Sequence, residues 1–149
     1  MSSKFNKLGI LGIVSVLTVL TGMAVSGVLQ SSRTITSTGT IKAIGVEVYW
    51  NSDGTDPVSS IDWGNPEPNE TVTKTVYVEN TGNSGMTLSL VVSNWTPTGA
   101  DTYLTVSWDR EDHLLGAGER ATAVITLTVS ADITGIDTFS FDMVIEGTG

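Results

Sequence analysis

The chain has 149 residues, of which 16 are acidic and 7 basic, for a formal net charge of −9. This length suits one domain. The acidic charge disfavours binding to nucleic acid or to an anionic membrane surface. There is no cysteine, which excludes disulfides and thiolate metal sites. An exported domain of this composition would draw its durability from its core, from glycans or from assembly with neighbours.

The N-terminus has the organisation of an export signal. Lys4 and Lys7 precede an uncharged apolar run over residues 8–29, and small residues follow, which is the order of regions in a signal peptide. Ala24 and Ser26 fit the small–x–small pattern and predict a signal peptide over residues 1–26, cleaved near Gly27. The alternative is an uncleaved membrane helix to about residue 29, because about 20 apolar residues span a bilayer. Both place the domain outside the cytoplasm.

The segment after the leader predicts a strand that is too sparse to form a core of its own. Its residues from 34 to 41 are Thr34, Ile35, Thr36, Ser37, Thr38, Gly39, Thr40 and Ile41. The odd positions form one face, and the threonines, which favour extended backbone, form the other. Small Ser37 and Gly39 would fit a groove walled by larger side chains. Ile35 and Ile41 would fill its ends, each contributing about 1.5–3 kcal/mol of burial.

From residue 44 onward the chain predicts an all-β domain over residues 44–149. Apolar residues alternate with polar ones between segments rich in turn residues. The six expected inward rows are Ile44, Val46, Val48 and Trp50; Val72, Val76 and Val78; Met86, Leu88, Leu90 and Val92; Leu104, Val106 and Trp108; Ala123, Ile125, Leu127 and Val129; and Phe139, Phe141, Met143 and Ile145. Six strands in roughly a hundred residues indicate a two-sheet, immunoglobulin-like sandwich, which ordinarily has seven.

The strand at 34–41 would supply the missing seventh, either to its own sandwich or to another. Folding back in its own chain is the simpler alternative, since termini are often tied into a sheet. Against it, no Asn-Gly or Pro-Gly turn lies between Gly39 and Ile44, which disfavours a tight hairpin. We therefore expect residues 27–43 to be a donor strand and linker that project from the body. A projecting strand beside an incomplete sandwich predicts β-augmentation between chains, and head-to-tail contacts of this kind produce a fibre.

No enzymatic, cofactor or metal site is expected. His113 is the only histidine, and no G-x-S-x-G segment is present to offer a nucleophilic serine beside it. The loop NSDGTD over residues 51–56 resembles a calcium loop in Asn51, Asp53 and Asp56. It lacks the later bidentate glutamate, and a polar β-turn explains it.

Two sequons predict N-glycosylation on a secreted domain, at Asn69 and at Asn94. Four tryptophans are many for a chain of this size, and exposed aromatics would suit a sugar-binding face. Trp50 and Trp108 fall on inward rows, whereas Trp63 and Trp95 lie at strand edges and are expected to line the acceptor groove.

These segments together carry a family resemblance. SRTITSTGTIKAIGVEVYW, SIDWG, TVYVENTGNSGMTLSL, SNW and TGIDTFSFDMVI resemble archaeal bundling-pilus and thread subunits, which are similar in fold to the TasA-type fibre-forming proteins of biofilms. The resemblance implies an immunoglobulin-like or jelly-roll-like β-sandwich that polymerises by donor-strand complementation. It also implies a secreted, cell-surface filament used in adhesion, cell–cell contact or biofilm. The partner would be a second copy of the chain, with membrane contact only through the leader.

Two other interpretations stay open at this point. One is a type IV pilin or archaellin-like subunit that retains the apolar helix of residues 8–29 as a filament core. The other is a membrane-anchored adhesive or sugar-binding module. The mature N-terminus separates the three, because it would lie near residue 27 for the donor-strand fibre, near 8 for a pilin and at 1 or 2 for an anchored module.

Overall fold

The structure is a computed structural model that describes residues 35–149. Within this range the chain is essentially all-β, with a single 3-10 turn, η1 (Ala100–Thr102). The strands are β1 (Thr36–Ile44), β2 (Glu47–Tyr49), β3 (Ser60–Gly64), β4 (Thr71–Glu79), β5 (Met86–Thr96), β6 (Leu104–Trp108), β7 (Leu114–Leu115), β8 (Arg120–Val129) and β9 (Thr138–Thr148).

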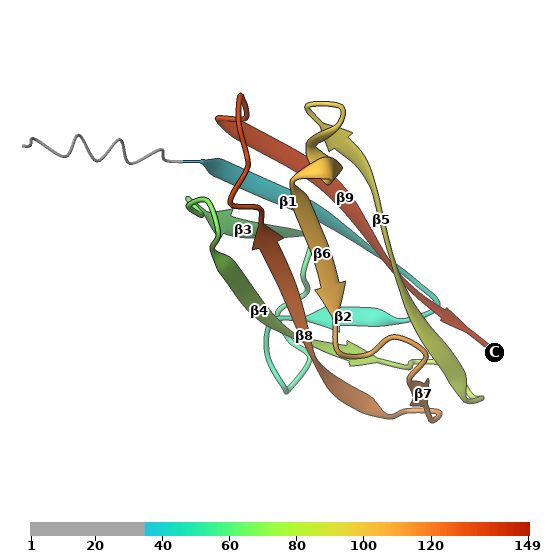
Figure 1. Cartoon of the computed structure of the whole chain (residues 1–149). Helices are drawn as coiled ribbons and strands as arrows, with labels where there is room; N and C mark the ends of the chain where they lie inside the picture. Colours follow the sequence, from blue (N-terminus) through green and yellow to red (C-terminus); the bar gives the residue numbers. More distant parts are fainter. Residues whose placement is uncertain (1–34) are drawn as a thin grey trace, which may run out of the picture. The chain divides into compact units, whose positions relative to one another are not determined.

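The strands form two sheets that enclose one core (Figure 1). Sheet A has the order β3-β1-β9-β5-β7, and sheet B has the order β2-β4-β8-β6. All pairs in the described range are antiparallel except β1 and β9, which run parallel. The predicted all-β, two-sheet architecture is confirmed.

The predicted alternation matches the buried faces closely in the two central strands. Every member of the β8 row from Ala123 to Val129 and of the β9 row from Phe139 to Ile145 is buried. The rows are only half-buried at Val72 in β4 and at Trp108 in β6. Both positions lie at an edge of sheet B, because β6 is its last strand and β2 pairs with β4 only from Tyr77 to Glu79.

One member of the predicted rows is wrong. Ile44 was expected to point inward, but its side chain is 45% exposed. β1 continues to Ile44 with its odd positions inward, and the inward row moves to even positions only at Val46 and Val48. The alternation therefore changes phase at Gly45.

A buried polar side chain closes the end of the sandwich. Asn80 is fully buried, and its Nδ2 donates to the carbonyls of Ser84 at 2.8 Å and Leu115 at 3.1 Å. Its Oδ1 accepts from Gly82 N at 2.9 Å. The bond to Leu115 is buried and gives a β7 carbonyl its partner in the interior, and the other two hold the backbone of the β4–β5 loop.

Several predictions concern residues that the structure does not describe. The signal peptide over 1–26, the cleavage site at Ser26–Gly27, the apolar run of 8–29 and Thr34 all lie outside residues 35–149. Among the described residues, none belongs to a helix long and apolar enough to cross a bilayer.

Candidate functional site: the β1 slot

The predicted donor strand lies in the middle of sheet A. β1 pairs with β9 over nine residues, from Thr36 opposite Thr138 to Ile44 opposite Glu146. On its other side it pairs with β3, from Ser37 opposite Gly64 to Thr40 opposite Ser60. We call the position between β3 and β9 the β1 slot. β1 is the only ladder partner of β3 in the described chain.

The described chain folds this strand back into its own sandwich, so the expectation of a projecting strand is wrong for the single chain. The reversal lies in the two residues between β1 and β2. Gly45 has a φ of 75°, a conformation that glycine adopts without steric cost, and Val46 then enters the core. We call Gly45 and Val46 the hinge. The segment lacks a two-residue hairpin signal, and a single left-handed glycine turns the chain instead.

The inner face of β1 matches its predicted role. Ile35, Ser37 and Ile41 are buried, whereas Thr36, Thr38 and Thr40 are exposed. Ser37 Oγ donates to the carbonyl of Gly64 at 3.3 Å, so the small polar side chain is bonded to the backbone of β3. Ile35 and Ile41 occupy the two ends of the buried row, as predicted.

Gly39 lies against the bulkiest part of the core. A Cβ atom at this position would meet Trp63 Nε1 at 3.0 Å, Met143 Cε at 3.1 Å and Phe141 Cε2 at 3.3 Å. The ring centroids of Trp63 and Trp95 lie 6.1 and 4.4 Å from that of Phe141. Gly39 therefore passes a wall of large side chains as expected, with Trp63 within direct reach and Trp95 packed on Phe141.

All four tryptophans pack against the hydrophobic core. Trp63 is buried, and Trp50, Trp95 and Trp108 are half-buried against the core. Trp108 Nε1 donates to Glu111 Oε2 at 2.7 Å, which fixes its ring at the edge of sheet B. No tryptophan is exposed in the described range, which holds all four.

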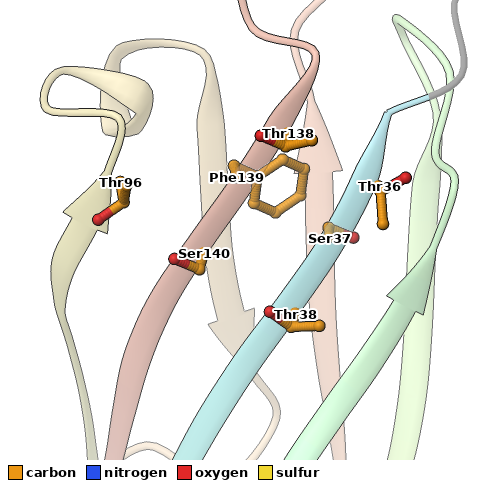
Figure 2. Close-up of a pocket in the computed structure, with 7 residues that line it drawn as sticks. All are labelled: Thr36, Ser37, Thr38, Thr96, Thr138, Phe139 and Ser140. Atoms are coloured by element: carbon orange, nitrogen blue, oxygen red, sulfur yellow. The ribbon is translucent and has the colours of Figure 1, made fainter.

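The outer face of β1 and its neighbours is lined with hydroxyls. Figure 2 shows the upper part of this face, where a hollow of about 250 Å³ lies over β1, β9 and the end of β5. It is lined by Thr36, Ser37, Thr38, Thr96, Thr138, Phe139 and Ser140. Short hydroxyl side chains on a twisted sheet offer hydrogen bonds to water without a charged or convergent group. This hollow carries no chemistry of its own.

Both predicted glycosylation sites lie on the surface. Asn69 is exposed in the turn before β4, with a φ of 66°. Asn94 is exposed at the irregular end of β5, with a φ of 54°, and its Nδ2 donates to Asp142 Oδ2 at 2.8 Å. Asn69 has the more open position, because the Asn94 amide nitrogen already holds a hydrogen bond across to β9. Glycosylation at both sites stays a prediction.

The loop at 51–56 is held together by its own polar groups. Asn51 Oδ1 accepts from the backbone nitrogens of Thr55 and Asp56, both at 3.1 Å. Asp53 Oδ1 accepts from Thr55 Oγ1 at 2.8 Å. These oxygens bond within the turn, as the β-turn interpretation expects. Nearby, the hydrogen bond that Tyr49 donates to Glu47 raises the pKa of the Tyr49 hydroxyl above its usual value.

His113 lies beside β5. Its side chain is half-buried in the β6–β7 connection, and its carbonyl accepts from Leu88 N at 2.9 Å. Among residues 35–149 no three histidine, aspartate or glutamate side chains gather as a metal cluster. The role of this segment is to cover the edge of β5.

Two features of the slot were missed in the sequence. The strand β3 contains only two inward residues, Ile61 and Trp63, too few for the alternation to be noticed. Gly147 packs tightly against Met86 and Val46, and its carbonyl would lie 2.6 Å from a Cβ at Gly45. The hinge could have been predicted from Gly45, because the inward positions are odd-numbered before this glycine and even-numbered after it.

Comparisons with known proteins give no further assignment. No protein-family model matches the chain, and a search of curated proteins finds no match.

Proposed function

We propose that this protein is the structural subunit of an extracellular filament, in which the β1 slot of each subunit is filled by β1 of a neighbour. The sandwich would be of immunoglobulin-like or jelly-roll-like type, and the filament would serve adhesion, cell–cell contact or biofilm. The observation that carries the proposal is the position of β1. It is a central strand whose only covalent connection to the rest of the described sandwich is the two-residue hinge.

The body is incomplete without β1. Removing it would leave β3 with no ladder partner in the described chain and would expose the nine-residue edge of β9. It would also uncover Trp63, Phe141 and Met143. Unpaired edges beside an apolar surface readily accept a strand from another molecule. The empty slot would therefore bind a strand whose inward side chains match those of β1.

A neighbour's β1 can make every contact that the chain's own β1 makes. The strand brings the same Ile35, Ser37, Gly39 and Ile41 to the same wall, whichever chain supplies it. Only the hinge has to change, from the turn at Gly45 to an extended connection. Exchange of an identical element is a low-cost route to assembly, and the family resemblance of the sequence supports its use here.

Paired cysteines test the proposal directly, because the natural chain has none. Thr38 and Ser140 are register partners on adjacent strands, and neighbouring strands lie about 4.7–4.9 Å apart, within the Cα separation of disulfides. In the full chain exported by its host, Thr38→Cys with Ser140→Cys should give a ladder of covalent multimers on a non-reducing gel. The matched control, Ser89→Cys with Glu146→Cys, joins β5 to β9 and should stay monomeric.

A monomer with an internal Thr38–Ser140 crosslink would overturn the proposal. That result would favour the second candidate, an anchored module that keeps its strand. The closure of β1 onto its own sandwich is the observation on that side.

A further inference from the structure

The exposed apolar side chains of the described structure share one surface. Ile44, Val91 and Leu114 are 45, 47 and 70% exposed, and they are the only large hydrophobic residues of residues 35–149 in the exposed class. All three lie on strands of sheet A, Ile44 on β1, Val91 on β5 and Leu114 on β7, at positions that alternate with the inward rows. The outer face of sheet B carries threonines instead, at Thr71, Thr73, Thr75, Thr105, Thr126 and Thr128.

The surface is centred on the end of β1 that meets the hinge. Val91 pairs with Val144 on β9, and Val144 pairs with Lys42 on β1, two residues before Ile44. Beside them lies a hollow of about 270 Å³ lined by Thr40, Lys42, Ser93, Asn94, Asp142, Met143 and Val144. We call Ile44, Val91 and Val144 the apolar patch. Its members come from the three neighbouring strands β1, β9 and β5.

We propose that the apolar patch is the second contact between subunits, covered by the body of the chain that donates β1. The inference rests on the proposed strand exchange. In the exchanged form Ile44 belongs to the donor, and the donor's β2 begins at Glu47. Three residues of extended chain span at most about 10 Å, so the donor's body has to lie beside the patch.

The apolar patch is large enough for a contact between subunits that are already joined, and too small to hold two free proteins together. Three exposed or half-exposed aliphatic side chains are too few for a stable interface between free proteins, which buries about 800 Å² on each partner. A tethered neighbour is different, because the inserted strand holds it at a high effective concentration. A small apolar contact then suffices to fix the angle between successive subunits.

Thiol labelling tests this inference without disturbing the core. In the exported full chain, Val91→Cys should react with a maleimide at least tenfold more slowly in filaments than in the monomer fraction from size exclusion. The matched control is Thr73→Cys, an exposed position on the outer face of sheet B, which should react equally in both. Electron microscopy of each variant checks that it still forms filaments.

The outcomes separate the two proposals. Equal labelling of Val91→Cys in filaments and monomers, with the Thr38–Ser140 ladder intact, overturns the patch contact and leaves strand exchange standing. Slow labelling of Thr73→Cys as well would mean that filaments bury both faces, which also overturns the specific contact. If no Thr38–Ser140 ladder forms, strand exchange fails and the patch contact fails with it.

Discussion

Replacing Gly39 by valine tests the narrowest point of the β1 slot. A Cβ at Gly39 would already lie 3.0 Å from Trp63 Nε1 and 3.3 Å from Phe141 Cε2, whereas favourable contacts between carbon atoms lie at about 3.5–4.0 Å. Valine adds two more methyl groups to the same space. Met143 can yield, because its side chain is flexible, but the two rings are packed against each other and against the core.

The magnitude follows from two opposing terms. Overpacking of this kind costs about 1–3 kcal/mol, and replacing glycine recovers about 0.4–1 kcal/mol by restricting the unfolded chain. We expect a net loss in the free energy of unfolding of about 0.5–2.5 kcal/mol. For a domain of about 115 residues, at about 4 °C for each kcal/mol, the melting temperature should fall by roughly 2–10 °C.

The assay is urea and thermal unfolding of the purified protein, followed by tryptophan fluorescence, with Trp63 as a local reporter. Thr38→Val is the matched control, because it introduces the same side chain one residue earlier on the exposed face of the same strand. Its stability should change by no more than about 0.5 kcal/mol. Equal stability of the two variants would refute the assignment of Gly39 to the packed face.

Four other predictions follow from particular residues. Asn80→Ala should lower the free energy of unfolding by at least about 2 kcal/mol, because it leaves buried backbone groups unbonded, whereas exposed Asn65→Ala should have little effect in the same urea titration. Gly45→Ala should raise the filament fraction in sedimentation, because it strains the closed hinge, whereas Gly135→Ala (φ 71°, with open space around it) should not. Removing N-linked glycans from native protein should lower its mass if Asn69 or Asn94 is modified, and an unchanged mass would reduce both sequons to coincidence. The mature N-terminus should be Gly27 by mass spectrometry, and recovery of residues 8–29 in the mature protein would instead favour a pilin or an anchor.

The sequence predicts the sheets well at long strands that have a neighbouring strand on each side. The rows of β8 and β9 are long, and every inward position is apolar, so their alternation alone identifies them. β3 and β7 are short and contain two and one buried residues. Their place in sheet A depends on partners far along the chain, and local patterning carries little information about such partners.

The sequence predicts which side chains of β1 point into a core, but not which sandwich the strand enters. Alternation places Ile35, Ser37 and Ile41 on one side regardless of which sandwich receives them. The destination depends on Gly45, whose left-handed backbone reverses the chain within two residues. A lone glycine between two alternating rows is compatible with either a turn or an extended passage. Sequence patterns of this kind therefore identify the strand and leave its partner undetermined.

Whether β1 closes on its own sandwich or on a neighbour's is also finely balanced in free energy. A closed chain and an exchanged chain have identical contacts in the β1 slot, so burial of Ile35 and Ile41 contributes nothing to the difference between them. What remains is the difference in free energy between the turned and the extended hinge at Gly45, the proposed contact at the apolar patch and the entropy of joining two molecules. The last term weakens as the concentration rises, and the first two are set by a few residues. If strand exchange operates as proposed, the hinge and the patch govern the choice between monomer and filament, while the slot determines how stable either form is once β1 is bound.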